Sequence, residues 1–426
     1  MSKKLELLAP AGNLLKLQTG LAFGAQAVYL GVPDFSLRAR ANNFDLNSLA
    51  AGINYAHDKG ALAYVTLNIF AHEEHLERLP EFLKKLRALG PDALIVADPG
   101  IIALVKKAWP EAVIHLSTQA NCTNSAAAKF WFEAGVSRVI LAREVTLEGI
   151  KAISQAVPGL ELEYFVHGAM CMAYSGRCFL SKELTGRSAN LGDCAQPCRW
   201  QYQLKPVGHD QEFEVIQEPE GSYFLNSQDL CLIEFLPELI EAGVTSFKIE
   251  GRAKSVYYEA VVTGIYAQAL AYCQADLAPV ELQEKLKNLK TELVEKLTHR
   301  GYTNGFLLGE KAGQTSDRTR LDCDWEFCGQ ALASRPEYFR PELKLGQSVA
   351  YFKVHNTWLV TDKVEIISPF YEVLRPEITI FYDAFSGEAL TEVHGGGGSR
   401  EIAVVLDQAV PELAVVRRQL KLVVKD

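Results

Sequence analysis

Four of the nine cysteines lie in the stretch Glu161–Trp200, at positions 171, 178, 194 and 198. Six, fifteen and three residues separate Cys171, Cys178, Cys194 and Cys198. Their neighbours are loop formers and cations: Gly176, Gly186, Asn190, Gly192, Pro197, Arg177, Lys182, Arg187 and Arg199. A loop with so little apolar material cannot hold itself together by burial alone. We therefore expect these thiols to be bound by something.

Three kinds of bond suit four clustered thiols. Disulfides need an oxidising compartment. Structural zinc prefers paired short Cys-x2–4-Cys knuckles, and only Cys194 and Cys198 have that spacing. An iron–sulfur cluster held by four thiolates tolerates irregular spacing and can sit in a loop beside a substrate pocket. The spacing favours an iron–sulfur cluster, of the 4Fe-4S type, over zinc and disulfides.

The other cysteines have plainer environments. Cys122, Cys231 and Cys273 lie in or beside apolar patterns, where a cysteine behaves as a small hydrophobe. Cys231, in the run DLCLIEFLPELI, is near enough in sequence to replace one of the four proposed ligands. Cys323 and Cys328 suggest no role.

Composition narrows the classes of function. The chain has 426 residues, of which 48% are hydrophobic, which is enough for a sizeable core. Its net charge of −9 gives no general affinity for nucleic acid, so an RNA partner would need a local basic patch. The first residues lack a continuous apolar segment, and no run approaches the roughly 18 apolar residues of a membrane span. We expect a cytoplasmic protein that does not contact the membrane.

Short apolar strands alternate with amphipathic helices through the first 275 residues. The predicted strands are 5–8, 27–31, 62–67, 93–97, 113–117, 138–142, 160–166 and 246–249. Continuous apolar strands separated by helices indicate a parallel sheet buried on both faces. Eight such units predict a (βα)8 TIM-like barrel, with the cysteine loop inserted after strand 7. A doubly wound open sheet is the alternative, although it lacks a Gly-x-Gly-x-x-Gly fingerprint after the first strand.

A barrel predicts active residues just past the C-terminal ends of its strands. Those positions hold Pro10, Gly12, Gly31, Asn68, Asp98, Gln119, Arg143, Glu144, His167, Gly168, Glu250 and Arg252. From them we predict His167, Glu250, Arg252 and Arg143 as catalytic residues. The predicted substrate-binding residues are Asn68, Gln119, Arg177, Arg187 and Arg199. Any one of them is as readily an ordinary polar loop residue.

Strand 7 also carries a carboxylate. Glu163 and His167 are four residues apart, which predicts that both lie on one strand face. Inside a barrel, Glu163 would need a partner such as Lys248 or Arg252. Glu250 and Arg252 could pair at the mouth, or Arg252 could hold a substrate carboxylate.

Beyond the barrel, the sequence predicts a charged helix over Pro279–His299 and a linker over Gly301–Arg320. From about Phe327 it predicts short strands of a small, mostly antiparallel, β-barrel-like domain. The predicted domains are residues 1–275 for the barrel with its cysteine loop at 168–200, 276–326 for the helix and linker, and 327–426 for the β domain.

Several segments together resemble peptidase family U32 over the whole chain. They are Leu7–Asn13, Gly176–Ser181, Cys194–Arg199, Phe247–Arg252 and, for one branch, His299–Thr303. That branch is similar to proteins of prephenate-dependent 5-hydroxylation of tRNA uridine. The resemblance implies a barrel with a cluster loop, Cys171, Cys178, Cys194 and Cys198 as cluster ligands, and oxygen-independent hydroxylation of RNA. It implies a wobble uridine in the tRNA anticodon loop as substrate, prephenate as co-substrate and an electron donor as partner.

The family name instead implies proteolysis. The chain has neither a Gly-x-Ser-x-Gly elbow nor a His-Glu-x-x-His zinc motif. A cysteine protease would need one of the four thiols free and paired with a histidine such as His167. The hydroxylase is the favoured function, and a peptidase and a noncatalytic metal-thiolate scaffold remain alternatives.

Overall fold

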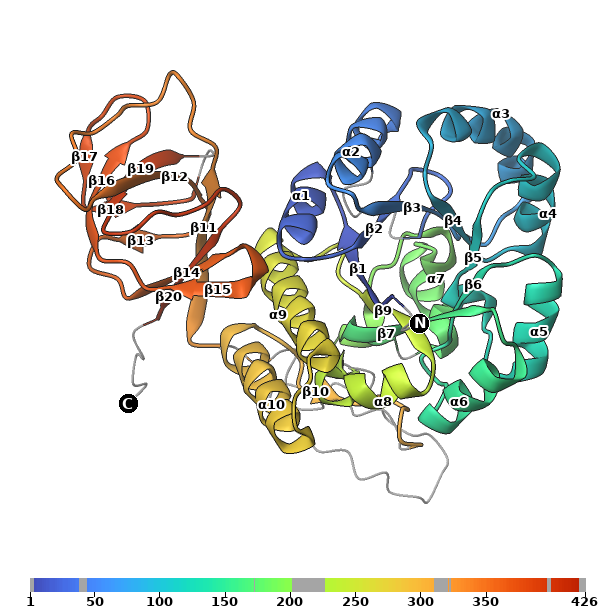
Figure 1. Cartoon of the computed structure of the whole chain (residues 1–426). Helices are drawn as coiled ribbons and strands as arrows, with labels where there is room; N and C mark the ends of the chain where they lie inside the picture. The colour runs from blue at the N-terminus through green and yellow to red at the C-terminus, as the bar shows by residue number, and fades with distance from the viewer. Residues whose placement is uncertain are drawn as a thin grey trace, which may run out of the picture.

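The computed structural model describes residues 4–37, 44–171, 173–200, 227–309, 321, 323–396 and 400–420. Its larger part is a closed barrel of eight parallel strands. These are β1 (Glu6–Ala11), β2 (Ala27–Gly31), β3 (Leu62–Leu67), β4 (Ala93–Val96), β5 (Ile114–Leu116), β6 (Arg138–Ile140), β7 (Glu161–Ala169) and β9 (Val244–Ile249). Consecutive strands pair in order, and β9 pairs with both β7 and β1, which closes the ring (Figure 1). The predicted (βα)8 barrel is confirmed.

Helices connect the strands and cover the outside of the barrel (Figure 1). They are α1 (Leu14–Ala22), α2 (Leu46–Asp58), α3 (Glu73–Leu89), α4 (Pro99–Ala108), α5 (Ser125–Glu133), α6 (Leu147–Ala156), α8 (Leu236–Glu241) and α9 (Val256–Gln274). Six of them begin after a residue whose side chain caps the first turn: Asn13, Asp45, Asp98, Asn124, Thr146 and Ser255. Such caps satisfy backbone N–H groups that a helix cannot pair itself. Asn13 and Asp98 thereby hold the short turns that follow β1 and β4.

The segment between β7 and β9 carries the cysteine loop. It contains η2 (Tyr174–Gly176), α7 (Leu180–Thr185), η3 (Ala189–Leu191), η4 (Pro197–Arg199) and, after the undescribed residues, β8 (Asp229–Cys231) and η5 (Ile233–Phe235). From the sequence we also expect a hairpin around residues 223–225, which lie outside the described residues. The apolar pattern of residues 230–242 predicts a helix, and this prediction is wrong in its first part, because β8 pairs antiparallel with the end of β7. Pro237 lies in the first turn of α8, where proline favours a helix start.

Helix α10 (Pro279–Lys296) packs beside α9 and is followed by β10 (Tyr302–Thr303). The C-terminal part is an antiparallel sheet, as predicted. In spatial order its strands are β15 (Glu372–Leu374), β14 (Val364–Ser368), β20 (Val415–Gln419), β11 (Trp325–Leu332), β12 (Ser348–Val354), β19 (Glu401–Leu406), β16 (Ile378–Asp383) and β17 (Ala389–Leu390). A small pair, β13 (Trp358–Leu359) and β18 (Glu392–Val393), lies beside it.

The sheet is joined to the barrel by a buried ion network. Arg417 of β20 is fully buried and lies 2.6 Å from a carboxylate oxygen of Glu365 and 3.0 Å from one of Glu292 on α10. The turn η6 (Pro369–Tyr371) packs on α9, and Tyr371 donates a hydrogen bond to Glu292. These contacts fix the sheet against the outer side of the barrel (Figure 1).

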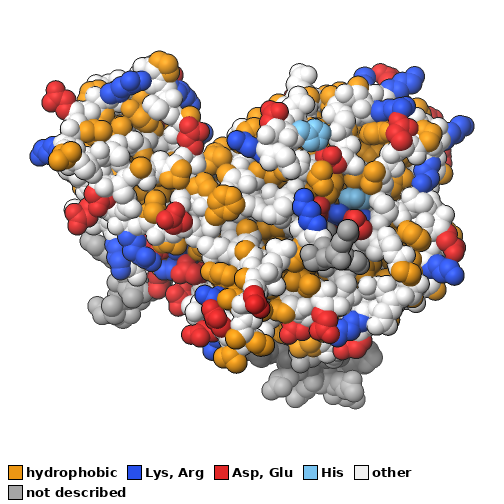
Figure 2. Space-filling view, in the orientation of Figure 1, with side chains coloured by type: hydrophobic (Ala, Val, Ile, Leu, Met, Phe, Trp, Pro, Cys, Tyr) orange, Lys and Arg blue, Asp and Glu red, His pale blue; other side chains and the backbone are white. Residues whose placement is uncertain are grey.

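The space-filling view shows a furrow between the sheet and the barrel, with acidic and basic side chains interspersed over the visible face (Figure 2). In the described ranges, no helix has both the length and the apolarity that a membrane crossing requires.

Candidate active site at the barrel mouth

A cavity of about 90 Å³ lies at the C-terminal end of the barrel strands. Asn68, Gln119, Arg143, Glu250 and Arg252 all line it, together with Cys171 and Gly176 of the cysteine loop. The structure therefore brings together five of the nine predicted catalytic and substrate-binding residues, which come from four different strand ends. This is the arrangement that parallel strands impose on residues at their carboxyl ends.

Hydrogen bonds hold the polar wall of this cavity in place. The amide of Asn68 accepts a hydrogen bond from the Leu37 N–H and lies 3.5 Å from Ser117 Oγ. Ser117 Oγ in turn accepts from the Gln119 N–H at 3.3 Å. Asn68 and Gln119 are thus fixed relative to each other through one serine hydroxyl.

The side chain of Gln119 is 8% exposed, and its Oε1 accepts no hydrogen bond from any described residue. A buried amide oxygen without a donor costs free energy, and in a cavity that cost is removed when a ligand supplies the donor. Gly176 leaves room for this amide, because a Cβ at that position would lie 2.7 Å from Gln119 Nε2. Gln119 is therefore placed to bind a ligand with an N–H or O–H group.

Two arginines flank the amide wall. The guanidinium of Arg143 lies over the Phe165 ring, 3.8 Å from its centroid. Arg252 is buried, donates to the Leu37 carbonyl, and lies 5.9 Å from the centroid of the Tyr29 ring. Its own carbonyl approaches Gly12 so closely that a Cβ there would lie at 2.2 Å. The predicted ion pair between Glu250 and Arg252 stays a prediction.

Below the cavity, charged side chains fill the barrel interior. Lys248 Nζ, which also lines the cavity, lies 2.7 Å from Glu163 Oε1, as the sequence predicted for one of two possible partners. Arg138 bridges Glu163 and Glu6, at 3.3 Å and 2.5 Å. Burial lowers the pKa of Lys248, and Glu163 acts against that shift. The floor of the site is therefore a fixed, charged network.

The cysteine loop is anchored to the rim of the same cavity. Arg177 donates two hydrogen bonds to the backbone carbonyl of Gln119, at 2.8 and 3.2 Å. Asn190 accepts from the Cys178 N–H through its side chain and from the Phe70 N–H through its backbone carbonyl. These contacts hold the loop over the mouth, as predicted.

All nine cysteines are free thiols, so the disulfide alternative is wrong for this structure. Burial raises the pKa of Cys198. The Arg199 cation acts against this shift, Cys171 and Cys194 add to it, and Arg300 also acts against it. These four groups thus lie within electrostatic range of Cys198. Cys194 Sγ accepts a hydrogen bond from the Gln196 N–H at 3.3 Å.

Within the part of the chain that the structure describes, no three His, Cys, Asp or Glu side chains converge on the position of a single metal ion. A four-iron cluster differs from a single ion, because its four thiolates surround a group of atoms rather than one point. Thiols on one rim loop, cations near Cys198 and an N–H donor to Cys194 suit such a cluster, since thiolates and negative charge need this stabilisation.

His167 does not line the cavity. It is buried among the rings of Tyr258, Tyr266 and Tyr302, and burial lowers its pKa to about 3. The prediction that it shares a strand face with Glu163 is wrong. A register shift between Phe165 and His167 interrupts the alternation of β7, so that Glu163 points into the barrel and His167 contacts α9.

The remaining predicted residues lie around the cavity rather than in it. Arg187 pairs with Asp193 at 3.0 Å and donates to the Cys194 carbonyl, so it supports the loop itself. Asp98 caps α4. Cys231 is buried on β8, 3.8 Å from the Tyr266 hydroxyl.

Sequence reasoning missed one charged group beside the cysteines. Arg300 forms a buried ion pair with Asp229 at 2.6 Å. Burial is the main cause that lowers the pKa of Lys254. Arg199 and Arg300 lower it further, and the Asp229 carboxylate acts in the opposite direction. Arg300 and Arg199 thus act on Cys198 and on Lys254 alike. In the sequence, Arg300 is marked only by the motif His299–Thr303. That motif is about 100 residues from Cys198, so the sequence gave no reason to place it near the cysteine loop.

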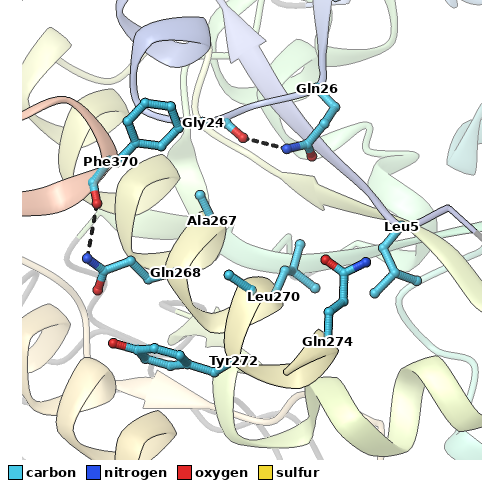
Figure 3. A pocket seen from close by; sticks show the side chains of 10 residues that line it. Leu5, Gly24, Gln26, Ala267, Gln268, Leu270, Tyr272, Gln274 and Phe370 are labelled. Atoms are coloured by element: carbon cyan, nitrogen blue, oxygen red, sulfur yellow. Dashed lines mark hydrogen bonds between the residues drawn. The ribbon is translucent and has the colours of Figure 1, made fainter. Parts of the chain in front are cut away.

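A second, larger hollow of about 480 Å³ lies outside the barrel, between α9, the turn after α1 and η6. Figure 3 shows its lining, which is apolar and amide-bearing, with Gln268 donating to the Phe370 carbonyl. None of the ten residues that line it is ionisable at neutral pH, so it offers no acid, base or cation for chemistry.

Comparisons with known proteins bear on the site. The family model described as peptidase family U32 matches residues 12–317. The chain is 42% identical over 431 residues to tRNA hydroxylation protein P of Helicobacter pylori strain J99, covering 98% of this chain and 99% of the relative. It is 39% identical over 313 residues to a 23S rRNA 5-hydroxycytidine synthase of Escherichia coli K12, covering 73% of this chain and 46% of the relative. It is 31% identical over 325 residues to a collagenase of Porphyromonas gingivalis W83, covering 74% of this chain and 76% of the relative.

Proposed function

The chain belongs to peptidase family U32, and we propose that it is an RNA-modifying enzyme that hydroxylates C5 of a wobble uridine in tRNA. The relatives named for RNA hydroxylation support this reaction class. The observation that carries the proposal is that Cys171, from a four-thiol loop, lines the same cavity as Gln119 and Arg252. A redox-capable group and substrate-binding side chains would then share one opening.

Cys171, Cys178, Cys194 and Cys198 would hold an iron–sulfur cluster. When bound, such a cluster supplies electron transfer or polarises an oxygen donor at the mouth of the cavity. Arg199 and Arg300 would stabilise the negative charge of the thiolates, and the Gln196 N–H would do so at Cys194. Asn190 and Arg177 would keep the loop seated while substrate binds.

The amide of Gln119 is complementary to a uracil edge. Uracil offers an N3–H donor beside carbonyl acceptors, and a glutamine amide offers an acceptor beside two donors. A base can reach this cavity only when it is unpaired, because the base edges in a helix are stacked and paired. RNA loops provide such bases, and proteins bind them splayed out of the stack. An anticodon loop therefore suits the site.

Replacing C5–H by C5–OH adds one oxygen atom to the base and removes two electrons from it. The proposal therefore needs an oxygen-donating co-substrate that takes up two electrons, directly or through a redox partner of the protein. We place a prephenate-derived carboxylate in this role. Its carboxylates would bind Arg143 and Arg252, since planar guanidinium groups match carboxylate geometry. The exposed Lys182 would contact RNA phosphates.

The test measures modified nucleosides in tRNA. A bacterial strain lacking its own tRNA uridine hydroxylase is complemented with the wild-type chain, and tRNA digests are analysed by mass spectrometry. Wild type should restore 5-hydroxyuridine derivatives. Cys194→Ser should abolish them, whereas Cys273→Ser, which changes a cysteine on α9, should not. A nucleoside profile identical to that of the empty vector would reject the proposed function.

Peptide hydrolysis is a second candidate, favoured by the name of the Porphyromonas gingivalis relative. A cysteine protease would need an imidazole beside the nucleophile. His167, the histidine predicted for that role, has its Nδ1 3.4 Å from the Tyr266 hydroxyl and is enclosed by aromatic rings. Gelatin cleavage that is lost on thiol alkylation would support this candidate.

A further inference from the structure

Three aromatic side chains of the cysteine loop are exposed. The exposed fractions are 53% for Tyr174, 75% for Phe179 and 43% for Trp200. Single exposed apolar residues are ordinary on protein surfaces, whereas several on one short segment mark an interaction site. Here the segment is also the one proposed to carry the reactive centre.

The loop that carries these rings also lines the cavity. Tyr174 begins η2, which packs on η1 (Thr118–Ala120), and Gly176 at the end of η2 lines the cavity. Phe179 immediately precedes α7 and Trp200 immediately follows η4. Because α7 and η4 pack against each other, Phe179 and Trp200 project from neighbouring elements. The three exposed rings therefore lie on the one loop that also contributes to the cavity wall.

The charge of the loop differs from that of the chain. Residues 171–200 contain four basic and two acidic side chains, whereas the whole chain has a net charge of −9. Lys182 is exposed on α7, one turn from Phe179. Aromatic rings interleaved with cations are the combination that binds single-stranded nucleic acid, because bases stack on rings and phosphates meet cations.

The size of the cavity decides where the rest of the RNA lies. Its volume of about 90 Å³ equals roughly three water molecules at about 30 Å³ each. A volume of this size has no room for a neighbouring nucleotide beside the target base. The nucleotides on either side of a base in the cavity must therefore lie outside it, and the loop that carries Tyr174, Phe179 and Trp200 is part of the cavity wall.

We propose that Tyr174, Phe179 and Trp200 form a stacking surface for the unpaired nucleotides that flank the target base. This inference rests on the proposed function and adds the way in which the RNA is held. Stacking is sequence-tolerant, since every base has a π face, so this surface would select an open loop rather than a particular sequence.

The test uses the full-length protein purified without oxygen and two fluorescent RNAs of equal length. One is a stem-loop with an anticodon-sized loop, and the other is a fully paired hairpin with a minimal tetraloop. Fluorescence anisotropy gives the Kd for each. Phe179→Ala should weaken stem-loop binding about tenfold and leave paired-RNA binding unchanged, in line with the loss of one base–aromatic stack.

Two further variants separate stacking from other roles. Phe179→Tyr keeps an aromatic ring and should bind like wild type, whereas Phe179→Leu keeps apolar volume and should bind like Phe179→Ala. The matched control is Phe130→Ala, which removes a ring that is 60% exposed on α5. It should change neither Kd.

The outcomes distinguish this inference from the proposed function. If wild type binds neither RNA, the proposed function fails and the stacking surface fails with it. If wild type binds the stem-loop and Phe179→Ala binds it equally well, only the stacking surface is overturned. Loss of turnover with unchanged RNA affinity would instead assign these rings to a protein partner and would overturn the inference.

Discussion

Lys248 Nζ lies 2.7 Å from Glu163 Oε1 inside the barrel, and both side chains are buried. The pair closes the floor of the cavity and links it to Arg138 and Glu6. A charge at this depth is tolerated only with its partner, because removing one member leaves the other without compensation. The pair therefore makes the cavity and the core interdependent.

Replacing Lys248 tests this dependence. Lys248→Met should lower the free energy of unfolding by about 3 kcal/mol, the range for breaking a buried pair, as measured by urea denaturation. Glu163→Gln added to Lys248→Met should recover part of the loss, since it removes the uncompensated charge. Lys290→Met, which breaks the partly exposed pair with Glu234, should cost less than about 1 kcal/mol. Equal losses in the two single variants would contradict this account.

The lowered pKa of Glu365 predicts how the stability of the protein depends on pH. Burial disfavours its charged form, and Arg417 and Lys296 outweigh burial, so the pKa of Glu365 lies below its ordinary value. A carboxyl with a depressed folded-state pKa contributes stability above its unfolded pKa, about 4.3 for glutamate, and loses it as the pH falls through the folded pKa. The difference in unfolding free energy between wild type and Glu365→Gln should thus be constant from pH 8 to pH 6 and shrink below about pH 4.

An exposed carboxylate provides the control for this measurement. Glu133→Gln changes a side chain whose ion pair with Lys129 is 3.9 Å long and open to solvent. Its difference from wild type should be small at every pH. A difference for Glu365→Gln that grows on acidification would reverse the sign of the predicted linkage.

Substitution of Gln119 should affect ligand binding without lowering the stability of the fold. Gln119→Leu removes an amide oxygen that has no donor, while the hydrogen bonds from Arg177 go to the backbone carbonyl and remain. The melting temperature should be unchanged or higher, and hydroxylation in the complemented strain should fall at least tenfold, about 1.4 kcal/mol of lost binding. Gln268→Leu, in the hollow beside α9, should leave hydroxylation unchanged. A Gln119→Leu protein with normal activity would remove Gln119 from the site.

The sequence predicted the barrel and its mouth because both depend on local pattern. Continuous apolar strands between amphipathic helices left few other folds, and residues after strand ends had to meet. Asn68, Gln119 and Arg252 were found on that ground alone. Lys248 as a partner of Glu163 followed from the cost of a buried carboxylate.

Features that depend on tertiary contact were beyond the sequence pattern. The shift in β7 that turns His167 outward has no local signature. Strand β20 was not predicted because Arg417 and Arg418 interrupt its apolar run, and their burial depends on Glu365 and Glu326 from other strands. Likewise, no spacing rule placed Arg300 near Cys198.

The most direct test of the central claim is the iron and acid-labile sulfide content of the protein purified without oxygen. Wild type should contain close to four of each per chain, the composition of a 4Fe-4S cluster. Cys178→Ser should lose most of both, whereas Cys323→Ser should retain them. Wild-type protein with zinc and no sulfide, or with neither metal nor sulfide, would contradict the claim that these four thiols hold an iron–sulfur cluster.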